Sequence, residues 1–315
     1  MREYGGYIEL DTYRLPMLHE GAIALNCGRN CLAYLIESKK IKKILLPYFM
    51  CESVFNLCKK YRIDIGFYHI DDQFKPQGVN LEEDTWFYVM NYYGQLSREY
   101  LSDLTERYNR VIIDNAQAYF EEPIPNADTI YTCRKFFGVP DGAFLYTNII
   151  SDEQYPLDES FERMHFLLGR FERSASEFYN EYSNNNHLFA DEPIKQMSKL
   201  TENLLHGIDY SYVNKTRASN FREYHKALKS INKLQPHEVQ GAFAYPLLVE
   251  NGREIRHTLQ QTKIYIPTLW PNVLDEVPKD SIEYQYAENI LPLPCDQRYC
   301  KEDIGYIVCL VQKYI

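Results

Sequence analysis

The middle of the chain carries a carboxylate, an amide and an amine in a fixed order. Asp114 closes an apolar run that begins at Val111, Gln117 follows closely, and Lys135 comes later in a turn containing Gly and Pro. An amine can form a Schiff base with an aldehyde, and a carboxylate can keep a ring nitrogen protonated so that the ring accepts electrons. Singly these residues are weak evidence, because a strand-end Asp is more often a helix cap. In this order they predict a site for pyridoxal 5'-phosphate (PLP).

A phosphate-binding segment should accompany such a site, and the residues after Leu25 offer one. Gly28 and Arg29 precede the apolar residues of a predicted helix, whose free N–H groups and positive dipole end can hold a phosphate. The Arg29 guanidinium could also contact the phosphate directly. An ordinary Gly/Asn helix start is the alternative, and it would be favoured if this segment stood alone.

The first half of the chain alternates short apolar runs with segments of helical periodicity. We predict strands at 44–46, 63–68, 86–90, 111–113, 129–132 and 143–146, and helices at 52–61 and 100–108. This alternation predicts an α/β fold with a mostly parallel sheet sandwiched by helices. Because ligands bind beyond the carboxyl ends of such strands, the residues after each strand are the candidates for chemistry.

The second half indicates a smaller C-terminal α/β domain. We predict helices at 197–205, 214–228, 252–261 and 301–314, strands at 244–249 and 264–266, and a loop at 184–186. The domain boundary should lie in the long helix near 215–228. This gives a large PLP-binding domain at 1–215 and a small domain at 216–315, with the first 20 or so residues packing on the small domain.

Composition excludes several classes of function. The 315 residues have a formal charge of −10 and a pI near 5.4, which argues against a nucleic-acid binder working through phosphate contacts. The longest apolar run, 44–51, is too short to span a bilayer, and the first residues lack the apolar stretch of a signal peptide. The eight Cys and eight His show no metal-ligand spacing. We therefore expect a cytoplasmic protein with reduced thiols, no metal and no membrane contact.

These residues together resemble the DegT/DnrJ/StrS family of sugar aminotransferases, which have the aspartate-aminotransferase fold (fold type I of the PLP enzymes). The resemblance runs in order over nearly the whole chain. It rests on the phosphate loop at 26–29, the strand end at 46–51, the segments at 89–94 and 114–118, Lys135, the helix segment 217–224 and the closing Leu-Pro-Leu at 291–293.

The resemblance implies roles for individual residues. Lys135 would hold the cofactor and act as general base and acid, Asp114 would keep the ring protonated, and Gln117 would bond the ring hydroxyl. Cys51 aligns with the aromatic that stacks on the ring, with Phe49 or Tyr48 as alternatives. The implied catalytic residues are Lys135 and Asp114, and the implied cofactor-binding residues are Gly28, Arg29, Cys51, Asp114, Gln117, Thr132 and Lys135.

The implied activity is transfer of an amino group from glutamate to a keto group on a nucleotide-linked sugar, by a homodimer. Two departures accompany it. The residues after the lysine are Pro140 to Ala143 in place of Gly-Glu-Gly-Gly, and the Asn-Tyr-Arg loop that reaches the neighbouring subunit is not evident, although Lys195 or one of Asn184 to Asn186 could replace it. A sugar dehydratase is one alternative, but the dehydratases that resemble this family have His in place of the lysine, whereas this chain has Lys135. A non-catalytic sugar-nucleotide-binding or assembly protein is the other.

Overall fold

Eight strands form one sheet in the computed structural model, which describes residues 4–315. Their order across the sheet is β1-β8-β7-β6-β5-β2-β3-β4. The central pairs β3–β2, β2–β5, β5–β6 and β6–β7 are parallel, whereas β8 runs antiparallel to both β7 and β1. The strands are β1 (Ile23–Leu25), β2 (Lys43–Pro47), β3 (Asp64–Ile70), β4 (Pro76–Gln77), β5 (Thr85–Met90), β6 (Val111–Asp114), β7 (Asp128–Thr132) and β8 (Ala143–Tyr146).

Both faces of this sheet are covered, which explains why its central strands are almost wholly apolar. Side chains alternate between the faces along each strand. Ile44 and Ile112 pack with helices α1 (Gly28–Ser38) and α2 (Glu52–Lys60). Leu45 and Ile113 pack on the opposite side with α3 (Arg98–Arg107) and with residues from the second half of the chain. The predicted α/β class with a mostly parallel sheet between helices is confirmed.

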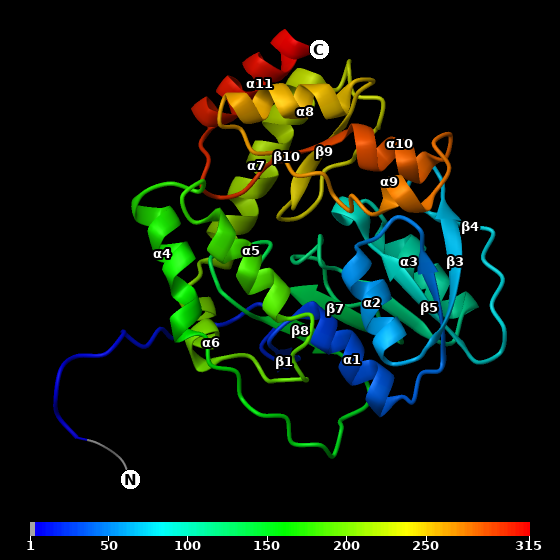
Figure 1. Ribbon diagram of the computed structural model, residues 1–315, viewed down its shortest axis with the longest axis vertical. Helices are drawn as coiled ribbons and strands as arrows, with labels where there is room; N and C mark the ends of the chain where they lie inside the picture. The colour runs from blue at the N-terminus through cyan, green and yellow to red at the C-terminus, as the bar shows by residue number, and fades with distance from the viewer. Residues whose placement is uncertain (1–3) are drawn as a thin grey trace.

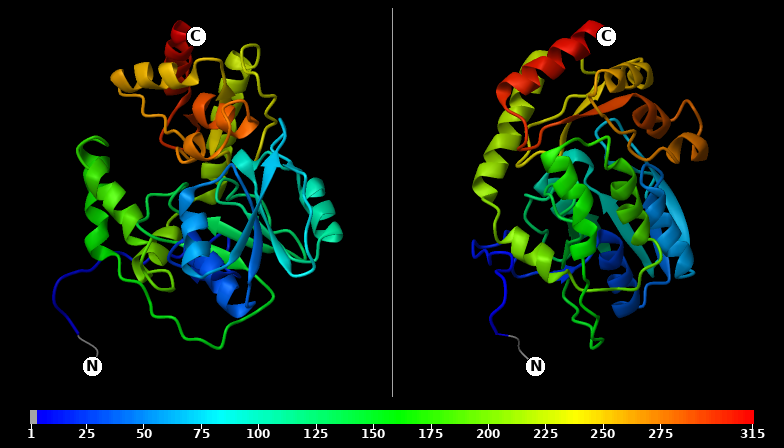
Figure 2. Two further views of the ribbon diagram at one scale, coloured as in Figure 1. Left: turned by 45° about the vertical axis from the view of Figure 1, so that its right-hand side comes forward. Right: turned by 60° about the vertical axis from the view of Figure 1, so that its left-hand side comes forward.

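The second half adds a group of helices beside the sheet and a smaller α/β unit above it (Figure 1). The unit is built on a two-stranded antiparallel sheet of β9 and β10 with its own apolar core. Figure 2 shows α7 running from the lower part of the molecule into this unit. The elements are η2 (Phe161–Met164), α4 (His165–Glu172), α5 (Tyr179–Leu188), α6 (Lys199–Leu205), α7 (Tyr210–Leu228), β9 (Ala244–Leu248), α8 (Gly252–Gln261), α9 (Val273–Glu276), α10 (Ile282–Asn289), β10 (Ile290–Pro294) and α11 (Lys301–Tyr314). Within the described residues, no helix is both long and apolar enough to cross a membrane.

Two local predictions were wrong. Asn184 to Asn186 lie inside α5 instead of in a loop, because tertiary contacts of Asn185 and Asn186 outweigh the low helix propensity of Asn. Residues 264–266 form no strand: Ile264 and Ile266 are buried in the core of the small unit, but β9 pairs there with β10.

The N-terminal segment packs on α6 instead of on the small unit. The backbone N–H groups of Tyr13 and Leu15 donate to the Asn203 side chain and the His206 carbonyl. Residues 1–3, which belong to the same prediction, lie outside the described residues.

Candidate functional site

Besides β3, five strands of the large sheet end at the same edge. β2, β5, β6 and β7 are parallel, and β1 joins them in direction because β8 between β1 and β7 is antiparallel to both. The segments that follow these strands are therefore neighbours at the carboxyl edge, where ligands of such sheets bind. They are 26–29, 48–51, 91–94, 114–117 and 132–135. Every predicted site residue lies in one of these segments.

Asp114 is the last residue of β6, and its carboxylate is held from two sides. The Tyr88 hydroxyl donates to Oδ2 at 2.6 Å, and the Ala116 backbone N–H donates to Oδ1 at 2.7 Å. Burial, followed by the Asp114 charge, raises the pKa of Tyr88 far above its usual value, so the phenol stays protonated and remains a donor. Asp114 itself is 8% exposed, which leaves the carboxylate within reach of a ligand.

Gln117 is fixed at one end and unsatisfied at the other. Its Oε1 accepts the backbone N–H of Tyr93 at 2.8 Å, whereas its Nε2 has no hydrogen-bond partner although the residue is only 1% exposed. A buried amide donor without a partner costs free energy, and such groups often mark ligand positions. Because the hydrogen bond from Tyr93 fixes the orientation of the Gln117 amide, its Nε2 is a donor that points in one direction.

Cys51 caps the N-terminus of α2 and is half-buried between the two main apolar clusters. It follows β2, which pairs with β5, the strand that carries Tyr88. The two alternative stacking residues have other partners. The Phe49 ring packs edge-on against Trp270 at 4.6 Å, and the Tyr48 ring stacks on Phe67 at 4.9 Å.

Lys135 lies in the turn after β7, the neighbour of β6 in the sheet. Its side chain is exposed, and across residues 4–315 it forms no hydrogen bond or ion pair; its Nζ lies 5.7 Å from the centre of the Phe243 ring. The Phe243 ring also packs against Tyr93, whose N–H holds Gln117. Thr132 ends β7, and its hydroxyl has no partner in the described part of the chain. The amine is thus uncommitted, and the structure does not bond it to Asp114.

The N-terminus of α1 carries a concentration of positive charge. Cys27 is the N-cap and its side chain makes no cap hydrogen bond; the Asn30 N–H donates to the Cys27 carbonyl, which leaves the N–H groups of Gly28 and Arg29 available. Burial raises the pKa of the Cys27 thiol, and the backbone N–H of Asn30 and the charges of Arg134 and Arg29 oppose this rise. A Cβ on Gly28 would meet only Ile130, at an ordinary 3.8 Å, so protein packing does not require glycine here.

Asn186 bonds both of these arginines. Its backbone carbonyl accepts from Arg29 Nη2 at 2.9 Å, and its side-chain oxygen accepts from Arg134 Nη1. The Nε of Arg134 has no partner and is buried. Of the residues predicted to replace the missing loop, Asn186 therefore faces the phosphate segment of its own chain, whereas Lys195 is engaged with Glu192 at 2.8 Å.

The altered residues after Lys135 join the turn to α6. Asp141 is fully buried and accepts hydrogen bonds from the Ser198 N–H at 2.8 Å, from the Ser198 hydroxyl at 2.7 Å and from the Thr201 hydroxyl. Gly142 has a φ of +111°, and a Cβ there would lie 2.9 Å from the Thr201 side chain. The hydrogen bonds therefore explain why an aspartate stands at 141, and the backbone conformation and close packing explain why a glycine stands at 142.

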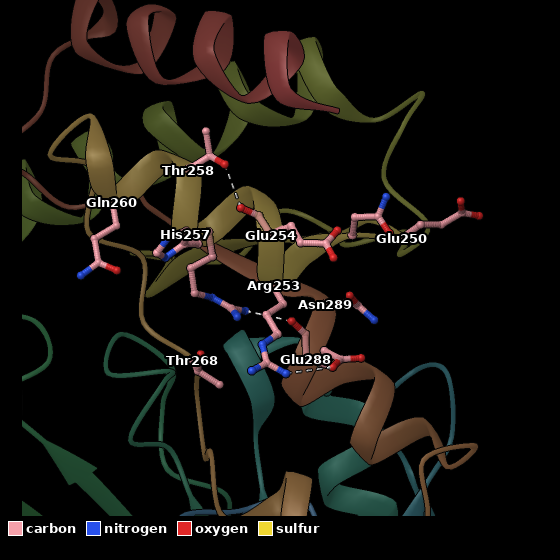
Figure 3. Close-up of a pocket in the computed structure, with 11 residues that line it drawn as sticks. Glu250, Arg253, Glu254, His257, Thr258, Gln260, Thr268, Glu288 and Asn289 are labelled. Atoms are coloured by element: carbon pink, nitrogen blue, oxygen red, sulfur yellow. Dashed lines mark hydrogen bonds and ion pairs between the residues drawn. The ribbon is translucent and has the colours of Figure 1, made fainter.

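A cleft of about 800 Å³ opens along α8 (Figure 3). Its charged lining is mixed, with the cations Arg253 and Arg256 and the carboxylates Glu250, Glu254 and Glu288. It contains none of the predicted site residues. Residues 4–315 contain no cluster of three or more His, Cys, Asp or Glu side chains suited to a metal ion.

Several residues at the edge were not identified from the sequence as parts of the site. Tyr88 reads as a core position of a strand and Phe243 as the residue before one, and nothing in their sequence context reveals that Tyr88 bonds Asp114 or that Lys135 Nζ lies over the Phe243 ring. The contacts of Arg217 and Gln297 with the carbonyl of Phe136 were also missed. The sequence signal for Arg217 was its resemblance to a long family helix, which assigned it no role.

Comparisons with known proteins give a fold. No protein-family model and no curated protein sequence matches the chain. Among solved structures, it is similar to a DegT DnrJ EryC1 StrS aminotransferase from Brucella abortus, with 15% identity, a TM-score of 0.60 and coverage of 93% of this chain and 86% of the other.

Two further structures agree. The PLP form of the putative sugar aminotransferase Spr1654 from Streptococcus pneumoniae has 13% identity and a TM-score of 0.64, and covers 95% of this chain and 89% of its own. Helicobacter pylori PseC, an aminotransferase involved in the biosynthesis of pseudoaminic acid, has 14% identity and a TM-score of 0.62, with 93% and 86% covered. The chain therefore has the fold of these sugar aminotransferases.

Proposed function

We propose that the protein is a PLP-dependent aminotransferase that moves an amino group from an amino acid, glutamate in our expectation, to a keto group on a nucleotide-linked sugar. The observation that carries this proposal is the pairing at adjacent strand ends of a fixed, partly accessible carboxylate, Asp114, with an uncommitted amine, Lys135. The shared fold supports it.

The residues present fit PLP in three respects. The orphaned Nε2 of Gln117 is a donor for a ring hydroxyl, and Asp114 is an acceptor for a protonated ring nitrogen. The uncapped start of α1 with Arg29 and Arg134 suits a phosphate, although Asn186 must release these arginines to admit one. By the resemblance, Cys51 takes the position of the aromatic residue that stacks on the ring, with Phe49 or Tyr48 as alternatives.

When bound, PLP supplies an electron-accepting ring that stabilises a carbanion at the substrate carbon. The protein's residues do the rest. Asp114 holds a proton on the ring nitrogen through charge, and Tyr88 keeps the Asp114 carboxylate in one orientation. Lys135 Nζ removes a proton from the donor's α-carbon and later returns one to the acceptor, as general base and acid. Thr132 offers a hydroxyl on the same turn.

The finer parts of the proposal concern the assembly, compartment and acceptor. We propose a homodimer, supported by large exposed apolar side chains on α4 and α5, among them Phe171 at 91% exposure. The described cysteines are all free thiols, consistent with a cytoplasmic location. A nucleotide sugar as acceptor rests on the resemblance and on the names of the similar structures.

The test measures PLP binding and its fixation by borohydride first, and the formation of 2-oxoglutarate from glutamate second. Purified protein should bind PLP with a yellow chromophore, and borohydride should fix the cofactor onto Lys135, identified by peptide mass spectrometry. Incubation with glutamate should then release 2-oxoglutarate. Lys135→Arg should abolish fixation and turnover. Lys215→Arg, which changes an exposed lysine of α7 that forms no hydrogen bond or ion pair within residues 4–315, should change neither.

A non-catalytic role is the rival that one observation favours, since Asn186 occupies both arginines of the phosphate segment. A protein that takes up no PLP, or takes it up without any fixation on Lys135, contradicts the enzyme proposal. PLP fixation without 2-oxoglutarate formation would favour the dehydratase-like alternative.

A further inference from the structure

Arg217 of α7 is a fully buried arginine whose partners are all uncharged. It is 1% exposed, and the described residues give it no ion pair. Its Nη2 donates to the Phe136 carbonyl at 3.0 Å, its Nη1 to the Ala242 carbonyl at 3.0 Å, and its Nε to Gln297 Oε1 at 2.8 Å. One guanidinium thus joins three segments that are far apart in the sequence.

Two of these three contacts flank the proposed catalytic amine. Phe136 directly follows Lys135, and Ala242 directly precedes Phe243, the ring over which Lys135 Nζ lies at 5.7 Å. The Phe136 carbonyl receives a second donor, Gln297 Nε2, at 2.9 Å. The Arg217 guanidinium also lies 4.7 Å from the Phe136 ring centre. The backbone beside the amine and the backbone beside its ring contact are therefore held by the same group.

Burying a charged group in the core costs free energy, because the group loses its hydration. Burial lowers the pKa of Arg217 to about 10, which shows the cost of removing this cation from water. Its planar fork of donors compensates by reaching carbonyls on separate segments at set angles, which an ammonium cannot do. Arg256 provides a comparison, because it is also buried and donates to two backbone carbonyls, those of Glu288 and Ile290, neither of which is next to Lys135 or Phe243 in the sequence.

We propose that Arg217, supported by Gln297, is a positioning residue that fixes the turn carrying Lys135 against the small unit. It sets where the amine lies without touching the reacting atoms. This inference rests on the proposed role of Lys135. Arg217 of α7 and Gln297 of the loop before α11 then also fix the position of the β7 turn relative to the segment before β9.

The experiment compares Arg217→Lys with Arg256→Lys in cofactor-free protein. The protein is treated with a limiting amount of an amine-reactive acylating reagent. The rate of acylation of Lys135 is measured by peptide mass spectrometry, relative to that of the exposed Lys279 in the same sample. Arg217→Lys should raise the relative rate for Lys135 by about threefold or more, because the turn loses a fixed contact, and backbone amides of 134–138 should exchange about tenfold faster. Arg256→Lys should alter neither, although it also lowers thermal stability.

Gln297→Leu covers the case in which Arg217→Lys does not fold, because Gln297 is only partly buried. It should produce a smaller change in the same direction. Equal Lys135 rates and equal exchange at 134–138 in the Arg217, Gln297 and Arg256 variants would overturn the inference.

A second readout separates this inference from the proposed function. In PLP-loaded protein, Arg217→Lys should shift the pH midpoint of the chromophore absorbance, whereas Arg256→Lys should leave it unchanged. A wild type that binds no PLP contradicts the proposed function, while the acylation contrast still decides whether Arg217 positions the turn.

Discussion

The turns after β6 and β7 are neighbours in the sheet, but they are held in opposite ways. The β6 turn is fixed from within: the Asp114 carboxylate receives Tyr88 and Ala116, and Gln117 receives Tyr93. The β7 turn leaves its functional side chain uncommitted. Lys135 is held through its backbone neighbours: the N–H groups of Phe136 and Phe137 donate to the Cys133 carbonyl, and Arg217 and Gln297 donate to the Phe136 carbonyl.

The difference corresponds to the tasks that we propose. A carboxylate that must keep one orientation toward a ring benefits from buried, complete hydrogen bonding. An amine that must transfer protons between two carbons needs freedom at its tip and a fixed base. The following predictions test this division.

Replacement of Asp114 by Asn should have the largest effect. The amide is nearly isosteric but cannot hold the ring proton by charge, so turnover of glutamate to 2-oxoglutarate should fall by about 10³-fold. Asp141→Asn alters a buried carboxylate that serves α6 instead, and should lower the urea midpoint of unfolding more than it lowers turnover per folded molecule. Turnover of the Asp114 variant within tenfold of wild type would show that the fixed carboxylate is dispensable.

Substitution of His19, which bonds the chain just after the β6 turn, tests how the free energy of unfolding depends on pH. Its Nε2 donates to the Tyr119 carbonyl at 2.9 Å, and burial lowers its pKa from 6.5 to about 4. The unfolded chain binds the proton first, so stability is complete above pH 6.5 and decreases as pH falls toward 4, by up to about 3 kcal/mol. His19→Gln should remove this part of the pH dependence in chemical unfolding, whereas the exposed His257→Gln should leave it intact.

Two glycines near the β7 turn should respond differently to alanine. Gly142→Ala must adopt a φ of +111° and meet Thr201 at 2.9 Å, so unfolding free energy should fall by about 2 kcal/mol. A methyl group on Gly138 would have no neighbouring atom within 4 Å, and this glycine has no positive φ, so Gly138→Ala should be neutral or slightly stabilising. Equal urea midpoints for the two variants would mean that the link to α6 does not constrain the turn.

The smallest effect should come from Asn186. Asn186→Ala removes the side-chain bond to Arg134 but keeps the carbonyl bond to Arg29, so PLP affinity should increase by about three- to fivefold. Titration of the cofactor-free protein by absorbance measures this change. Asn184→Ala, an exposed neighbour in α5, is the matched control. Weaker binding by the Asn186 variant would indicate that Asn186 supports the phosphate segment.

The sequence was sufficient to predict which segments meet at the carboxyl edge. Apolar runs and helical spacing located the strands that end at Asp114 and Thr132, and parallel topology then implied that their ends are neighbours. It also indicated the helix after Gly28, because a glycine followed by apolar residues at helical spacing is a local signal. These features depend on residues close together in the chain.

What it could not supply were the contacts between distant residues. Arg217 and Phe136 are separated by 81 positions, and Asn186 and Arg29 by 157. No local periodicity encodes such pairs, and a buried arginine looks like a surface charge on a helix until its carbonyl partners are seen. The same limitation explains the wrong loop at 184–186, where tertiary hydrogen bonds decided the conformation.

The pairing of β1 has a consequence for synthesis of the chain. Ile23 to Leu25 pair with Leu145 to Ala143 of β8 and with no other strand of the sheet in residues 4–315. During translation at about 5–20 residues per second, the segment leading to Gly28 therefore waits roughly 6–24 s for its partner strand. Until then both of its edges are open to other chains, and the edge that bonds residues 195–197 stays open longer. The end of the site that we propose for the phosphate is thus the last part of the sheet edge to assemble, and slow or paused synthesis before Ala143 would expose it longest.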